Sequence, residues 1–193
     1  MSDLKRATIV VVPGLRGHVE DHWQHRLAAR LPESRVLPTP GRDHHDLWER
    51  VAAVEDAVAG AEGPVVLVAH SAGVLTTVHW AARSRLTIRG ALLATPPDLA
   101  APLPAEYPSL EELERGGWLP VPQTPLPFPS IVAASTNDEL GDLRRVTAMA
   151  AAWGSRLDIV GPVGHLNPAS GYGDWPEAFA LLQDFGASIG AVI

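Results

Sequence analysis

The stretch Val65-Val66-Leu67-Val68-Ala69-His70-Ser71-Ala72-Gly73 decides how this chain folds, because it joins the clearest strand pattern in the sequence to the start of a helix. Its first five residues are uniformly apolar, which is typical of a strand buried on both faces of a parallel sheet. The segment 74–82 that follows is apolar nearly all round, as expected of a helix packed against that sheet. The turn between the two places a serine at the carboxyl end of a central strand.

Strand and helix patterns alternate on both sides of this unit. The expected strands are 8–12, 35–38, 65–69, 88–94, 131–134 and 157–160. The expected helices are 18–31, one capped by Asp46 and running to 58, 74–82, 142–153 and a last one capped by Asp174 with Glu177. Such alternation predicts the α/β class, with a mostly parallel sheet of about six strands and helices on both faces.

The segment 96–129 interrupts this alternation, since it holds ten of the eighteen prolines in the chain. Only a brief helix pattern, beginning at Ser109, is visible within it. A length of 193 residues suits one domain, so we expect residues 1–193 to form a single domain with 96–129 as a cap-like excursion. The aromatic residues Tyr107 and Trp118, with Leu119, are candidates for the wall of a pocket under that cap.

Composition excludes several classes of protein. Acidic residues outnumber basic ones by 22 to 15, the net charge is -7, and no basic cluster occurs, so a nucleic-acid partner is not expected. No apolar run approaches the roughly 18 residues of a membrane-spanning helix, and the N-terminal apolar stretch is too short for a signal peptide. The absence of cysteine excludes a disulfide, a thiolate zinc site and a cysteine nucleophile, and it fits a cytoplasmic location.

The segment Ala69-His70-Ser71-Ala72-Gly73 matches the G-x-S-x-G nucleophile elbow, with Ala69 in place of the first glycine. In such an elbow a strained turn lifts the serine hydroxyl above the sheet, and the tight turn needs small residues two before and two after the serine. An ordinary serine N-cap is the alternative. The buried strand before the motif and the helix after it favour Ser71 as a nucleophile.

A serine nucleophile needs a base within hydrogen-bond reach and an acid that orients the base. His165 lies in a glycine-rich loop after the last expected strand, and the other histidine that follows Ser71 in the chain, His79, lies within a helix. Asp138 comes just after the strand 131–134, whereas Asp142 is placed to cap the next helix. We therefore predict Ser71 as nucleophile, His165 as base and Asp138 as orienting acid.

Four blocks of the sequence carry a resemblance to a known family. They are Val12-Pro13-Gly14-Leu15 with His22-Trp23-Gln24, Val68 to Gly73, Ser135-Thr136-Asn137-Asp138, and Gly164-His165-Leu166-Asn167 with Ser170 to Pro176. In these blocks the chain resembles the small serine hydrolases of the retinoblastoma-binding-protein-nine and YdeN type, a compact branch of the α/β-hydrolase superfamily. The resemblance implies the same three catalytic residues. The chain departs from the family at Glu139, where the family often has proline, and at Ala72, where it often has leucine.

Acyl transfer creates an oxyanion that backbone N–H groups can stabilise. Ala72 is expected to supply the first N–H, because it follows the nucleophile. Leu15, in the loop after the first strand, is expected to supply the second, with Arg16 as the alternative. Trp23, Trp118 and Tyr172 are further candidates for the substrate pocket.

A group of histidines and carboxylates suggests a metal site as an alternative. Its members are His18, Glu20, Asp21, His22, His25, His44, His45 and Asp46. Their spacing matches neither H-E-x-x-H nor H-x-x-E-H, and a polar helix start explains it, so we expect no metal and no other cofactor.

The sequence leaves the substrate open. A small carboxylic ester is the favoured substrate, and a small amide or peptide bond is second. Transfer of the acyl group to another acceptor and an interaction module with a vestigial site remain alternatives.

Overall fold

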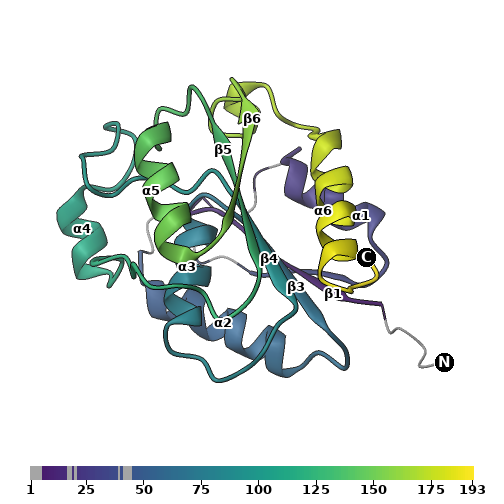
Figure 1. The fold of residues 1–193 in the computed structure, drawn as a ribbon. Coiled ribbons are helices and arrows are strands. Elements are labelled where there is room, and N and C mark those ends of the chain that lie inside the picture. The colour runs from purple at the N-terminus through teal and green to yellow at the C-terminus, as the bar shows by residue number, and fades with distance from the viewer. Residues whose placement is uncertain (1–5, 17–18, 20, 39, 41–44) are drawn as a thin grey trace.

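Six parallel strands form one sheet in the computed structural model, which describes residues 6–16, 19, 21–38, 40 and 45–193. The strands are β1 (Thr8–Val12), β2 (Ser34–Val36), β3 (Val65–His70), β4 (Gly90–Ala94), β5 (Ser130–Ser135) and β6 (Arg156–Gly161). Their order across the sheet is β2-β1-β3-β4-β5-β6 (Figure 1). The chain therefore runs outward from β1 to β2 and then returns to the other side of β1. Ligands of open α/β sheets bind at the carboxyl ends of strands where the order reverses in this way, which here are β1 and β3.

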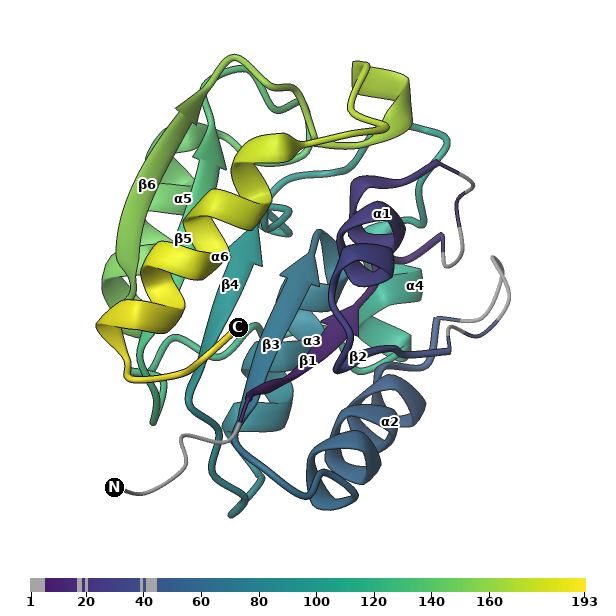
Figure 2. The same ribbon diagram turned by 90° about the vertical axis from the view of Figure 1, so that its right-hand side faces the viewer.

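Helices cover both faces of the sheet, as the two views of the ribbon show (Figures 1 and 2). One face carries α1 (Trp23–Arg30) and α6 (Pro176–Ser188), and the other carries α2 (Leu47–Ala59), α3 (Ala72–Ala81) and α5 (Leu143–Trp153). The short helix α4 (Leu110–Arg115) lies in the connection between β4 and β5. Within the described residues, no helix combines the length and the apolar character needed to cross a bilayer.

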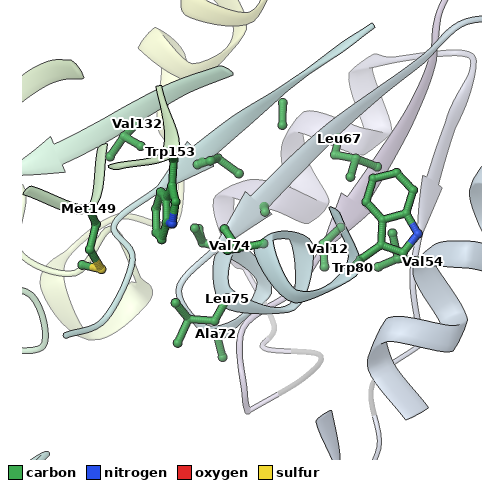
Figure 3. Close-up of a cluster of buried hydrophobic side chains, with 14 of the residues drawn as sticks. Val12, Val54, Leu67, Ala72, Val74, Leu75, Trp80, Val132, Met149 and Trp153 are labelled. Atoms are coloured by element: carbon green, nitrogen blue, oxygen red, sulfur yellow. The ribbon is translucent and has the colours of Figure 1, made fainter. Parts of the chain in front are cut away.

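The core is divided into two layers by the alternation of side chains along each strand. Val10 and Val12 belong to the layer under α2, α3 and α5, whereas Ile9 and Val11 belong to the layer under α1 and α6. Figure 3 shows the first layer, with Val74 of α3 between Trp80 on one side and Trp153 with Met149 on the other. Complete burial of one such side chain stabilises the fold by roughly 1.5–3 kcal/mol, so the central strands are firmly held.

The predicted elements are present, with differences at their ends. Helix α1 begins at Trp23 and not at position 18, and β4 begins at Gly90 and not at position 88. The expected caps of α2 and α5 are confirmed, since the carboxylates of Asp46 and Asp142 accept hydrogen bonds from backbone N–H groups of the first turn.

The cap predicted for the last helix is wrong. Helix α6 begins at Pro176, and its N-cap is Trp175, whose side chain makes no capping hydrogen bond. Proline is well suited to the first helical position, because its φ is already helical and its missing N–H would lack a partner there. Asp174 instead lies 3.5 Å from the guanidinium of Arg30.

Candidate active site

The backbone at Ser71 adopts a conformation that few residues other than glycine occupy. Its φ is 56° and its ψ is -126°, and its side chain makes no capping hydrogen bond to α3. A non-glycine residue held in this region costs of the order of 1–3 kcal/mol, which the surrounding sheet must offset. The serine is thus no ordinary N-cap, and its hydroxyl stays available at the carboxyl end of β3.

Close packing of the turn explains the requirement for glycine at position 73. A Cβ atom on Gly73 would lie 2.1 Å from the carbonyl oxygen of Val12 and 2.8 Å from that of Pro13. A Cβ atom on Gly14 would lie 3.3 Å from the Cβ of Ser71. The start of α3 and the loop after β1 therefore lie directly against each other, and the loop borders the serine.

His165 bridges Ser71 and Asp138. Its Nε2 lies 2.8 Å from the Ser71 Oγ, and its Nδ1 lies 2.8 Å and 3.0 Å from the two carboxylate oxygens of Asp138. The side chains of His165 and Asp138 are only 4% and 2% exposed. With the proton on Nδ1, the imidazole donates to Asp138 and its Nε2 accepts from the serine hydroxyl. This is the arrangement that activates a serine for attack on a carbonyl carbon.

The neighbouring carboxylates have other environments. Asp142 caps α5, where it accepts a hydrogen bond from the N–H of Arg145 at 3.2 Å. Glu139 is exposed. Asp138 also accepts a hydrogen bond from the N–H of Leu140 at 2.9 Å, which fixes the carboxylate toward His165.

Polar residues that sequence reasoning missed hold the loop of His165. The side-chain oxygen of Asn137 accepts a hydrogen bond from the N–H of Gly164 at 2.7 Å, and the hydroxyl of Ser170 accepts one from the N–H of His165 at 3.1 Å. The Nε2 of His70 lies 2.8 Å from the carbonyl oxygen of His165. Asn137 and Ser170 both lie inside the blocks of family resemblance, and their place there is the one sequence feature that could have identified them.

His22 and His70 form an uncharged layer beside His165. The ring centroids of His22 and His70 are 4.7 Å apart, and those of His70 and His165 are 5.0 Å apart. Burial, followed by repulsion from His25 and His165, lowers the pKa of His22 to about 4. Burial also lowers the pKa of His70 well below its usual range. Both rings are therefore neutral at pH 7.

The lowered pKa of His22 predicts a loss of stability in acid. Below about pH 6.5 the unfolded chain binds a proton at His22 that the folded protein does not, so the free energy of unfolding falls as the pH falls. Between pH 7 and pH 5 this one group accounts for about 2 kcal/mol. His22→Asn cannot titrate but keeps a side-chain acceptor at the N-cap of α1.

Urea unfolding of both proteins at pH 7 and pH 5 measures the effect. The variant should lose about 2 kcal/mol less stability than the parent over this range. Equal losses in the two proteins would contradict the low pKa of His22.

A mostly apolar cavity of about 130 Å³ opens beside Ser71 and His165. Trp118 and Tyr107 line it, and so do Leu15 and Ala72. Its remaining apolar walls include Leu75, Leu99, Leu103, Leu113 and Leu140. The guanidinium of Arg16 lies 4.4 Å from the centre of the Tyr107 ring at the same cavity.

Three proposed pocket residues lie outside this cavity wall. Trp23 is 1% exposed and packs edge-on against Trp175, with ring centroids 4.9 Å apart. Tyr172 packs against the core layer under α1 and α6, and Leu119 packs against the opposite layer. The pocket role of these residues is corrected: they contribute buried apolar area to the core. His22 and Gln24, which flank Trp23 in the chain, line the cavity instead.

Three residues of the alternative metal site have other partners in the structure. His22 accepts a hydrogen bond from the N–H of Gln24, Asp21 pairs with Arg26 at 3.0 Å, and Asp46 caps α2. Three further members, His18, Glu20 and His44, lie outside the described residues. Among the described residues, no three histidine, aspartate or glutamate side chains gather as metal ligands would.

The parallel sheet, the strained serine turn after β3 and the adjoining His–Asp pair define the class as a serine hydrolase of the α/β-hydrolase fold. The sequence model of the serine hydrolase family matches residues 9–184, and the chain belongs to that family. It is an enzyme of the serine hydrolase type.

Solved structures show the same fold. A YdeN-like hydrolase from Pectobacterium atrosepticum is 29% identical, with a TM-score of 0.82 over 95% of this chain and 92% of that one. The ydeN gene product of Bacillus subtilis is 18% identical, with a TM-score of 0.74 over 94% and 99%. Est1E from Butyrivibrio proteoclasticus, solved with ferulic acid bound, is 15% identical, with a TM-score of 0.69 over 95% and 91%. No curated protein sequence matches the chain significantly. The resemblance to YdeN-type hydrolases is confirmed.

Proposed function

We propose that this enzyme cleaves small carboxylic esters through an acyl-enzyme formed on Ser71. The observation that carries the proposal is the bridge of His165 between Ser71 and Asp138, with a distance of 2.8 Å on each side. His165 is the base, and Asp138 holds its ring in the required tautomer. Small amides are the second candidate substrates, since the same acyl-enzyme serves both.

The geometry supports a two-step reaction. The Ser71 Oγ attacks the ester carbonyl carbon while its proton moves to the Nε2 of His165, and the carbonyl oxygen becomes an oxyanion. When the tetrahedral intermediate collapses, the bond to the alcohol breaks and the alcohol oxygen takes the proton from Nε2. A water molecule then repeats the sequence on the acyl-enzyme, releasing the carboxylic acid and restoring Ser71.

Two backbone N–H groups are the proposed donors to the oxyanion. Ala72 is the first residue of α3, so its N–H has no acceptor within the helix. Leu15 follows Gly14, which lies against Ser71. Both residues line the cavity, as required of donors to an oxyanion formed there.

The cavity favours an uncharged apolar acyl group of limited size. Its volume of about 130 Å³ is close to that of an apolar protein cavity of about 150 Å³ that accommodates benzene. We therefore propose acyl groups of up to about six carbon atoms as the preferred substrates. The segment 96–129 supplies several of the walls and acts as the cap over this site.

Enlarging the cavity at Trp118 should change the choice of acyl chain. Trp118→Ala removes a large side chain from the wall, so kcat/KM should shift toward longer acyl groups by about tenfold relative to acetate, as one or two kcal/mol of added apolar contact allows. Leu119→Ala is the matched control, because Leu119 is the next residue but lies outside the cavity wall. A series of p-nitrophenyl esters from acetate to decanoate measures the shift. Equal losses at every chain length would show that Trp118 has no part in selectivity.

Reaction with a fluorophosphonate tests the proposed nucleophile. One equivalent of label is expected on Ser71, located by peptide mass spectrometry, together with hydrolysis of the short-chain esters. Labelling at another residue would refute the assignment. The absence of both labelling and hydrolysis would favour an interaction module with a vestigial site. Product formation that requires an added alcohol or amine would favour acyl transfer.

A cytoplasmic location and the lack of a nucleic-acid partner remain predictions.

A further inference from the structure

Arg50 of α2 holds the loop that follows β1. The residue is 5% exposed, and its two terminal nitrogens donate to consecutive backbone carbonyls. One N–H group donates to the oxygen of Gly14 at 3.2 Å, and the other donates to the oxygen of Leu15 at 2.9 Å. The planar guanidinium fork thus fixes two adjacent peptide groups at once.

Because a peptide group is planar, fixing the direction of its carbonyl also fixes the direction of its N–H. In a trans peptide the C=O of one residue and the N–H of the next point in opposite directions. Fixing the carbonyls of Gly14 and Leu15 toward Arg50 therefore turns the N–H groups of Leu15 and Arg16 away from it. Gly14, Leu15 and Arg16 all line the cavity, whereas Arg50 does not.

We propose that Arg50 is a positioning residue that aims the second oxyanion donor, the N–H of Leu15 or Arg16, at the cavity beside Ser71. The inference rests on the acyl transfer proposed above. Arg50 touches neither the substrate nor the reacting atoms, and it acts only through the peptide groups that it holds.

The surroundings of Arg50 strengthen its hydrogen bonds to the two carbonyls. Burial lowers the pKa of Arg50 to about 10, so the guanidinium remains charged at neutral pH. Hydrogen bonds from a charged donor are roughly twice as strong as those between neutral groups. The guanidinium carbon lies 5.8 Å from the centre of the Trp118 ring, so the same indole that lines the cavity also borders the guanidinium.

Stability alone gives a weak reason for an arginine at this position. Removing a charge from water is unfavourable, and apolar residues of similar volume often replace buried charges without loss of stability. The Nε of Arg50 is buried and has no hydrogen-bond partner among the residues that the structure describes. The grip on two carbonyls is what an apolar side chain would not reproduce.

Kinetics of Arg50→Met and Arg50→Lys on the best short-chain ester test the inference. Methionine keeps much of the volume without donors, and lysine keeps the charge without the fork. We expect Arg50→Met to lower kcat by about a hundredfold, the scale of losing one oxyanion donor, with KM changed less than about twofold. Arg50→Lys should also lower kcat, by about tenfold, because it keeps the charge without the planar fork. Arg35→Met is the control, because Arg35 also donates to a backbone carbonyl, that of Gly60 at 3.3 Å, but is exposed and does not line the cavity.

Two further measurements distinguish aiming from a general structural effect. A trifluoromethyl ketone adds to Ser71 and forms an oxyanion, so its inhibition constant should rise by the same factor as kcat falls. The affinity of a ketone-free substrate analogue should stay within about twofold. In Arg50→Ala, millimolar guanidinium should restore part of kcat, whereas ammonium at the same ionic strength should not.

The outcomes separate this inference from the proposed function. If wild-type enzyme is labelled at Ser71 and folded Arg50→Met or Arg50→Lys retains kcat within threefold, Arg50 has no positioning role although the triad stands. A loss of kcat without a matching loss of ketone affinity, or without guanidinium rescue, would also overturn the inference. Should Arg50→Met fail to fold, the lysine variant and the rescue experiment decide alone. Failure of wild-type labelling would instead refute the proposed function.

Discussion

Ser71→Ala is expected to lower kcat for short-chain esters by about a millionfold, the scale seen when a triad serine is removed. Without the hydroxyl no acyl-enzyme forms, and only oxyanion stabilisation and substrate binding remain. Those two contributions should still leave a rate about a thousandfold above the uncatalysed reaction. Fluorophosphonate labelling should disappear at the same time.

Ser130→Ala is the matched control for this experiment. Ser130 is a buried serine of the same sheet, and its hydroxyl pairs with that of Ser155 at 2.6 Å, away from the cavity. Its kcat should stay within a few fold of the parent. Labelling that persists in Ser71→Ala would move the nucleophile elsewhere.

Asp138→Asn is expected to lower kcat by about ten-thousandfold, as the same exchange does in a well-studied triad protease. Asparagine has the size of aspartate, but its amide N–H₂ can donate to the Nδ1 of His165. This exchange stabilises the tautomer with the proton on Nε2, which cannot accept the proton of Ser71. The fall should appear in kcat with little change in KM.

Asp142→Asn is the control for the acid, because asparagine caps helices about as well as aspartate does. Its turnover should stay within a few fold. Glu139→Gln combined with Asp138→Asn tests whether the exposed neighbouring carboxylate rescues the first variant. If Asp142→Asn lost its turnover while Asp138→Asn remained active, the assignment of Asp138 as the orienting acid would be wrong.

The sheet and its helices followed from the sequence because buried parallel strands are short, apolar and separated by helical periodicity. The run Val65 to Ala69 is an example: its residues face both layers of the core, so every position is apolar. Element ends were less predictable, since they depend on local hydrogen bonds. The start of α1 at Trp23 is set by the imidazole of His22, which accepts from the N–H of Gln24.

The candidate triad could be predicted because its chemistry demands particular residue types in a particular chain order. The residues that hold the backbone around it could not. Gln24 donates to the carbonyls of Val12 and Val68, and Arg50 donates to those of Gly14 and Leu15. Any residue has a carbonyl, so such contacts leave no pattern in the sequence of the acceptor.

Two of the expected wall residues, Trp23 and Tyr172, lie outside the cavity wall for a different reason. Both are aromatic residues next to site motifs, and a large ring serves equally well in a core. Which it does depends on the direction in which one helix position points. At α1 that direction places Trp23 against Trp175 and leaves His22 and Gln24 facing the cavity.

The position of β6 at the edge of the sheet gives the proposed base an exposed support. Among the strands that the structure describes, β6 pairs only with β5, and Ile159 within it is 54% exposed. The loop that carries His165 follows this strand, whereas Ser71 follows the central strand β3. Local opening of a protein starts where burial is least. We therefore expect mild heating to open the loop that carries His165 before the central strands unfold. Activity should then be lost before the core melts, and it should return on cooling.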